Sequence, residues 1–268
     1  MKKKLGSLLI ALILGALLLS QEPHINSKLT VHACKQAGQM FGTRPIDPQQ
    51  EKKIREIAHK MNIKEAIVIR RANASALQGF GYYNAFMYFP AFLRFIPTNA
   101  PAHLFVSEGF FEDLSQEEQV FLIGHELTHI KERHTKYIHL GYWILLCLFL
   151  LFWWRIEKWI RFFFRSYIHP KRFSFTLRCI QGVVLYVCVA IPNLSCLAYR
   201  RHMERVADIQ SIEMLKSHNG ALKLIDKWQN EYHVPENKRL FGLLSDHPLY
   251  KERKSYCLAF KKQFEGTT

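Results

Sequence analysis

The stretch HELTH, residues 125–129, combines two histidines and a glutamate at a spacing that suits a metal ion. His125 and His129 are four residues apart, so they would share one face of a helix. A tetrahedral zinc ion can take one nitrogen from each of them. Glu126 would then act as the general base on a water molecule at the metal, since zinc lowers the pKa of that water toward ~7. This H-E-x-x-H pattern is typical of metallopeptidases, and it predicts one zinc ion per chain.

A third ligand must come from another part of the chain, because catalytic zinc sites often combine two histidines with a glutamate. We favour Glu204, which belongs to the segment ERVAD in a predicted helix; a surface ion pair is its alternative role. Asp208 follows one turn later on the same face and could accept a hydrogen bond from the far nitrogen of a ligating histidine. His134 is better interpreted as a polar residue at a helix end. The remaining alternatives are His139, His202 and His247.

The helix that carries HELTH is marked at its start by a capping box. Ser115 would cap the helix and Glu118, three residues on, would reach back to it. The predicted helix therefore begins at Gln116, and we expect it to end soon after His134.

Hydrophobic periodicity predicts the other elements. The ERVAD helix should run over 200–217, with Asn219-Gly220 as its end. Further helices are expected from about Gln50 and over 221–231, and strands over 66–72, 84–89 and 102–107.

Three apolar runs indicate a membrane: residues 5–19, 138–154 and 179–199. A helix needs about 17 to 25 mainly apolar residues to cross a bilayer, and the second and third runs reach that length. The first run follows three lysines and has the pattern of a signal anchor or signal peptide; we favour an uncleaved anchor.

The net charge of +15 follows these runs and does not indicate nucleic-acid binding. Lysines 2–4 and the loop 155–178 supply nine of the excess positive charges. Lysine and arginine beside apolar runs mark the cytoplasmic side. With both segments cytoplasmic, residues 21–137 and 200–268 lie together on the outer side, so HELTH and Glu204 can meet.

The six cysteines include no C-x-x-C pair, which argues against a cysteine zinc site. The sequence does not decide whether Cys34 and Cys257 form a disulfide.

Three motifs together resemble a known family. The helix GHELTHIKERH, the upstream strand NAF and ERVAD after two hydrophobic segments are similar to the HtpX-like and CAAX-prenyl-protease group of membrane zinc metallopeptidases, which are gluzincins. The resemblance covers most of residues 66–253. It implies Glu126 as the base, Asp208 as a residue that orients a ligand, and three zinc ligands: His125, His129 and Glu204.

The same resemblance implies two further roles. The strand at Asn84, Ala85 and Phe86 would be the edge that pairs with an extended substrate. The segment DHPLYKER is similar to the family's downstream H-P motif, so His247 would stabilise the oxyanion or gate the cleft. Its alternative is a histidine that caps or packs a loop beside Pro248.

The chain departs from this family pattern in three respects. HtpX-like proteins usually have two hydrophobic segments before the zinc helix and this chain has one, which would turn the active site to the extracytoplasmic side. Arg200-Arg201 stands where those proteins have Ser-Arg, and the insert 87–100 is longer, which could alter the substrate groove.

The predicted fold class is α+β: a zincin-like metallopeptidase domain, mostly helical with a small sheet, plus about three transmembrane helices. The expected order is a signal anchor or signal peptide at 1–20, a linker at 21–50, the first part of the peptidase domain at 51–137, a transmembrane helix at 138–154, a basic loop at 155–178, a transmembrane helix at 179–199 and the second part of the peptidase domain at 200–268.

The predicted function is a membrane-bound zinc metalloendopeptidase. The resemblance implies that it cleaves unfolded or damaged membrane or envelope proteins, a protein quality control role, and that its partners are polypeptides and the lipid bilayer, without nucleic acid. The expected location is a bacterial inner membrane. Two alternatives remain: a non-catalytic chaperone-like or adaptor protein with the same fold, and a specialised prenyl-protein protease.

Overall fold

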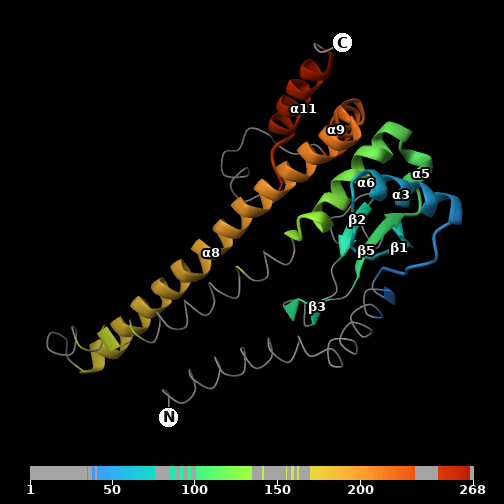
Figure 1. Cartoon of the computed structure of the whole chain (residues 1–268). Coiled ribbons are helices and arrows are strands. Elements are labelled where there is room, and N and C mark those ends of the chain that lie inside the picture. The colour runs from blue at the N-terminus through green and yellow to red at the C-terminus, as the bar shows by residue number, and fades with distance from the viewer. Residues whose placement is uncertain are drawn as a thin grey trace.

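The computed structural model describes residues 35, 38–39, 41–75, 85–88, 91–92, 96–97, 101–134, 141, 155, 158–159, 162, 170–232 and 247–265. Within these residues the chain is mostly helical with a small sheet, as predicted. The sheet and three helices gather on one side of a long helix, and two further helices lie beside its C-terminal end (Figure 1). The helices are α3 (Pro48–Lys60), α5 (Phe110–Asp113), α6 (Gln116–Lys131), α8 (Pro170–Leu215), α9 (His218–Tyr232) and α11 (Tyr250–Glu265).

The predicted strands form a three-stranded sheet with β5 (Ala102–Ser107) in the middle. Strand β1 (Ile67–Ala72) pairs with β5 in parallel, and β2 (Ala85–Tyr88) pairs with it antiparallel. The short strands β3 (Ala91–Phe92) and β4 (Ile96–Pro97) form a separate antiparallel pair. Strand β2 is therefore an edge of the described sheet.

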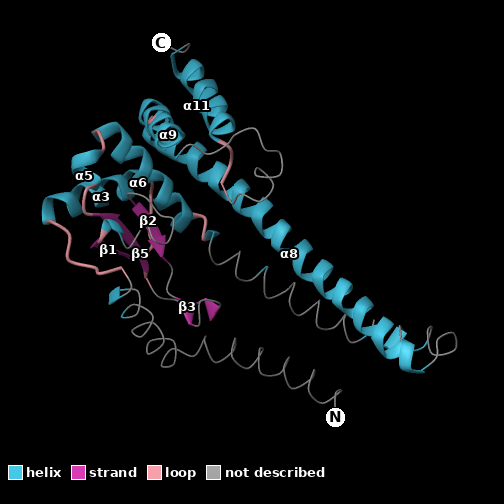
Figure 2. Cartoon of the chain, turned by 180° about the vertical axis from the view of Figure 1, so that it is seen from behind, coloured by secondary structure: helices cyan, strands magenta, loops and turns pink. Residues whose placement is uncertain are grey.

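Strand β5 is buried along its whole length, because both faces of the sheet are covered. Its side chains alternate between the faces. Leu104 and Val106 join the main core together with residues of α3 and α6. Phe105 meets Phe41 on the other side, with their ring centroids 5.0 Å apart. Helix α6 also packs against β2, so the HELTH helix lies beside the edge strand (Figure 2).

Helix α6 begins as predicted but ends earlier. The capping box is present, and the carboxylate of Glu118 accepts the backbone N–H of Ser115 at 2.8 Å. The helix ends at Lys131, not after His134. Arg133 takes a φ of 50°, in the left-handed region that stops a helix, so α6 does not continue to His134.

Helix α8 unites two predicted elements, since the apolar run 179–199 and the ERVAD helix are one continuous helix of 46 residues. The prediction that Asn219-Gly220 ends it is wrong. The turn after α8 is made by Lys216, which has a φ of 52°, and Asn219 and Gly220 both lie in α9. Gly220 serves close packing instead: a Cβ at this position would lie 2.1 Å from the backbone oxygen of Glu117.

Among the residues that the structure describes, no helix is both long and apolar enough to cross a bilayer. Residues 5–19 lie outside the described residues, as do those of 138–154 other than Gly141. The membrane boundaries and the division into domains stay predictions. Cys34 is also outside the described residues, and Cys257 is a buried free thiol whose pKa burial raises to about 12.

Candidate metal centre

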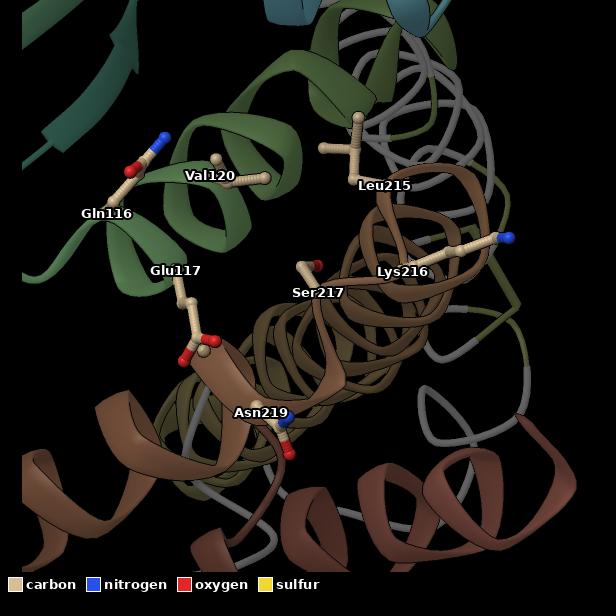
Figure 3. A pocket seen from close by; sticks show the side chains of 8 residues that line it. Gln116, Glu117, Val120, Leu215, Lys216, Ser217 and Asn219 are labelled. Carbon is tan, nitrogen blue, oxygen red and sulfur yellow. The ribbon is translucent and has the colours of Figure 1, made fainter. Parts of the chain in front are cut away.

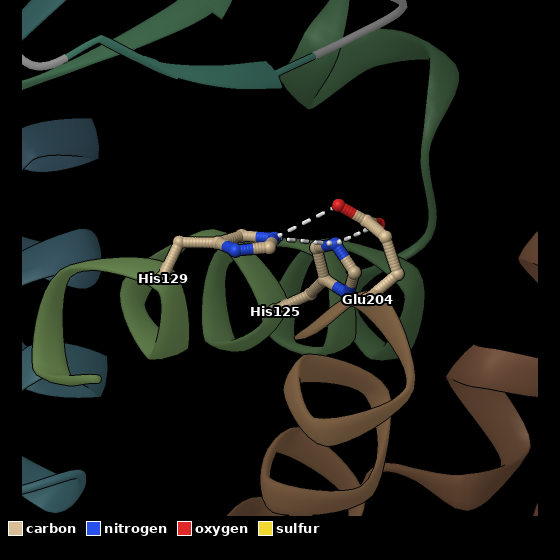
Figure 4. A group of neighbouring side chains, drawn as sticks. All are labelled: His125, His129 and Glu204. Carbon is tan, nitrogen blue, oxygen red and sulfur yellow. Dashed lines mark hydrogen bonds and ion pairs between the residues drawn. The ribbon is translucent and has the colours of Figure 1, made fainter. Parts of the chain in front are cut away.

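Helices α6 and α8 bring three potential metal ligands together. The Nε2 atoms of His125 and His129 lie 3.2 Å apart. They lie 3.2 Å and 3.4 Å, respectively, from the two carboxylate oxygens of Glu204. Figure 4 shows the two imidazoles of α6 facing the carboxylate that α8 supplies.

The spacing of these donor atoms fits a zinc ion. Zinc binds histidine nitrogen and carboxylate oxygen at about 2.0–2.2 Å in a tetrahedron, so neighbouring donors should lie about 3.3–3.6 Å apart. The separations between the two histidine nitrogens, and from each nitrogen to one oxygen of Glu204, are 3.2, 3.2 and 3.4 Å and come close to that range. Two histidines and a glutamate are also a common catalytic zinc set, so both donor type and spacing suit the metal.

Asp208 contacts the other side of His125. Its Oδ1 lies 2.8 Å from Nδ1 of His125, which leaves Nε2 of that ring for a metal. The carboxylate is fully buried, one helical turn after Glu204 on α8. This is the contact expected of a residue that orients a ligand.

The contacts that hold Asp208 in place were not predicted from the sequence. Arg253 of α11 donates to both carboxylate oxygens, at 2.8 Å from Nε and 2.6 Å from Nη2, and the hydroxyl of Tyr256 donates to Oδ2. The guanidinium of Arg253 also lies over the ring of Trp228, 5.2 Å from its centroid. Arg253 ends the DHPLYKER segment, but nothing in its spacing pointed to Asp208.

The charges of the site favour a cation among the donor atoms. Burial lowers the pKa of His125, but its hydrogen bonds to Asp208 and Glu204 outweigh that effect and raise the pKa to about 10. Burial would raise the pKa of Glu204, but His247 and His129 hold it well below its usual range. Similarly, burial is outweighed at Asp208 by Arg253 and His125, and the pKa falls to about 2. A proton on His125 or a metal ion can provide the positive charge.

The other predicted site residues lie close by or on the neighbouring edge strand. Glu126 is half-buried on α6, directly after His125. His247 is exposed, and its Nδ1 lies 3.0 Å from Oε2 of Glu204. It therefore reaches the donor cluster, which consists of His125, His129 and Glu204. Ala85 and Phe86 belong to edge strand β2, while Asn84 lies outside the described residues.

Of the remaining histidine candidates, His202 and His134 are not among the clustered donors, and His139 lies outside the described residues. His202 is exposed on α8. The side chain of His134 is buried, and its Nδ1 lies 2.9 Å from Nδ1 of His129, a contact that the sequence did not predict. The reason is the early end of α6.

Gly124 explains how α8 comes close enough to supply Glu204. A Cβ at this position would lie 2.4 Å from Cδ1 of Leu215 and 2.5 Å from Oγ of Ser211. Both neighbours are on α8, so the glycine before HELTH lets the two helices approach closely.

A pocket of about 250 Å³ lies at the other end of α6, where α8 turns into α9 (Figure 3). It is lined by Gln116, Glu117, Val120, Leu215, Lys216, Ser217, Asn219 and Gly220. None of these is a predicted site residue, and we assign the pocket no role.

The sequence profile described as Peptidase family M48 matches residues 48–256, which include every element of the centre except the last residues of α11. The chain belongs to peptidase family M48. Within this M48 chain, His125, His129 and Glu204 could hold a metal ion.

A solved structure supports the fold of this M48 chain. The crystal structure of Ste24p from S. mikatae aligns with a TM-score of 0.58 at 14% sequence identity. The alignment covers 85% of this chain, which spans 55% of that protein's length. At this identity the likeness is one of fold. No curated protein sequence matches the chain significantly.

Proposed function

We propose that this M48 chain is a zinc endopeptidase that uses one zinc ion, held by His125, His129 and Glu204. The observation that carries the proposal is the convergence of three side chains. The Nε2 atoms of His125 and His129 lie 3.2 Å apart, and each lies 3.2–3.4 Å from one carboxylate oxygen of Glu204. Behind them, the buried carboxylate of Asp208 contacts Nδ1 of His125. Both the donor set and its spacing suit zinc.

The residues around the donors suit peptide hydrolysis. A bound zinc ion would supply Lewis acidity toward the scissile carbonyl and toward water. Glu126 would take the proton from the attacking water and deliver it to the leaving amine. His247 would donate a hydrogen bond to the oxyanion, a role that its exposed position beside Glu204 supports.

The edge strand suits binding of an extended polypeptide. In the described sheet, β2 pairs with β5 on one side, and its other side faces away from the sheet. A substrate strand could add to this edge through backbone hydrogen bonds, with Asn84, Ala85 and Phe86 as the pairing residues. Because α6 packs against β2, a peptide on this edge would lie beside the donor cluster.

The proposed location is a membrane, with the bilayer as a partner and a bacterial inner membrane as the setting. Support comes from the three apolar runs and the basic loop between the second and third. Large apolar side chains are exposed on α8, including Val183 and Tyr186, which lie within the third run. If the basic loop 155–178 is cytoplasmic, the peptidase domain would face the extracytoplasmic side, where unfolded or damaged membrane and envelope proteins would be its substrates.

The test is cleavage of an unfolded protein by the detergent-purified chain, compared with Glu126→Gln at equal zinc content. We expect the wild type to cleave and the variant to bind zinc without cleaving. Zinc binding without cleavage by either protein would favour a binding or adaptor role. Cleavage that a lipidated peptide blocks, but an unrelated unfolded protein does not, would favour a specialised prenyl-protein protease.

A further inference from the structure

His134 makes the same kind of contact with His129 that Asp208 makes with His125. Its Nδ1 lies 2.9 Å from Nδ1 of His129, and the two rings are nearly perpendicular, at 74° with centroids 5.0 Å apart. The side chain of His134 is buried, with 6% exposed. Nε2 of His129 points toward the donor cluster, so the contact with His134 lies on the opposite side of the ring.

The proton count of this pair assigns a direction to the hydrogen bond. Two imidazole nitrogens 2.9 Å apart can share one proton, so one ring donates and the other accepts. A histidine that ligates a metal through Nε2 carries its proton on Nδ1. If Nε2 of His129 is a ligand, its Nδ1–H must donate and Nδ1 of His134 must accept.

We propose that His134 is a positioning residue of the metal centre, which fixes the tautomer and the ring orientation of His129 by accepting its Nδ1 proton. The inference rests on the proposed zinc site. It makes the two histidines of HELTH unequal: a carboxylate orients the first, and a neutral imidazole, which is a weaker acceptor, orients the second.

The backbone after α6 is shaped to bring His134 to this position. On a continued helix, a residue five positions after His129 would lie on a different face. The helix instead ends at Lys131, and Arg133 adopts φ of 50° although it is not a glycine, which costs about 1 kcal/mol. The turn is also tied to α8, since Gln210 donates from Nε2 to the carboxylate of Glu132 at 2.8 Å.

The experiment compares three substitutions of similar size. His134→Asn keeps an acceptor oxygen where Nδ1 stands, His134→Gln moves the amide one atom further out, and His134→Leu removes the acceptor. Zinc affinity is measured by chelator competition on the detergent-purified full chain, and thermal stability is measured on the metal-free protein. His103→Leu is the matched control, because His103 is equally buried at 6% but packs on β5 against Phe105.

We expect His134→Leu to bind zinc about 10-fold to 100-fold more weakly, His134→Asn to stay within about threefold of the wild type, and His134→Gln to fall between them. His103→Leu should lower the melting temperature without changing zinc affinity. Unchanged zinc affinity in His134→Leu, or equal losses in His134→Leu and His134→Asn, would overturn the inference. A wild type that binds no zinc would instead overturn the proposed function, so the two failures are distinguishable.

Discussion

Arg253 and Asp208 form a bidentate ion pair inside the protein, between helix α11 and helix α8. The same carboxylate contacts His125, so one buried anion joins the C-terminal helix to a predicted metal ligand. Because such contacts orient ligating histidines, the position of α11 and the affinity for metal should depend on each other.

Arg253→Met should therefore affect both stability and metal binding. Removing one partner of a buried ion pair leaves the other charge unpaired, and we expect a loss of about 3–5 kcal/mol in the free energy of unfolding. Lys254→Met is the control on the same helix. Its ion pair with Asp226, at 2.6 Å, is partly exposed and should contribute at most about 1 kcal/mol. Denaturant unfolding and chelator competition measure the two effects, and equal effects of both variants would contradict the expected link between α11 and the metal centre.

Asp208→Asn tests the orientation of His125 directly. The amide has nearly the shape of the carboxylate but no charge, so we expect zinc affinity to fall about 10-fold to 100-fold. The variant also leaves Arg253 buried without its anion. Combined with Arg253→Met, the unfolding losses should be less than additive by about 1 kcal/mol or more, because the two residues share one interaction. Additive losses in the double variant would show that the ion pair does not couple them.

The donor cluster was predictable from the sequence because its key separations are local. His125 and His129 are four positions apart, which puts them on a common face of any helix, and Glu204 and Asp208 have the same spacing. That the two segments meet followed from the expectation that the apolar runs 138–154 and 179–199 return the chain to the same side.

The residues that support the cluster were not predictable, because their contacts depend on where helices end and how they pack. His134 reaches His129 because α6 ends at Lys131 and Arg133 adopts a left-handed conformation. Arg253 lies 45 residues after Asp208, and only the packing of α11 on α8 brings them together. Gly220 was interpreted as a helix end, whereas its lack of a side chain serves the contact with Glu117.

Two glycine substitutions should separate helix packing from metal binding. Each adds a Cβ inside the protein: Gly124→Ala against side chains of α8, and Gly220→Ala against the backbone oxygen of Glu117 at 2.1 Å. Side chains can shift more easily than backbone, so we expect the larger stability loss for Gly220→Ala, about 1–3 kcal/mol or more. Only Gly124→Ala should weaken zinc binding, because it separates α6 from α8. Thermal unfolding of the metal-free protein and chelator competition give the two measurements; weakened zinc binding in Gly220→Ala alone would contradict this assignment.

The buried histidine His103 should make stability depend on pH between about 7 and 4. Burial, with a contribution from Arg70, lowers its pKa in the folded protein from 6.5 to about 4. The unfolded chain therefore takes up a proton first as the pH falls, and stability that is complete above pH 6.5 is lost toward pH 4. For this group alone we expect a loss of about 2 kcal/mol between pH 7 and pH 5. His103→Leu should remove that part of the slope and leave the part due to other groups, so the measured quantity is the difference between the two unfolding curves at each pH. Parallel curves for the wild type and the variant would mean that His103 does not titrate in this way.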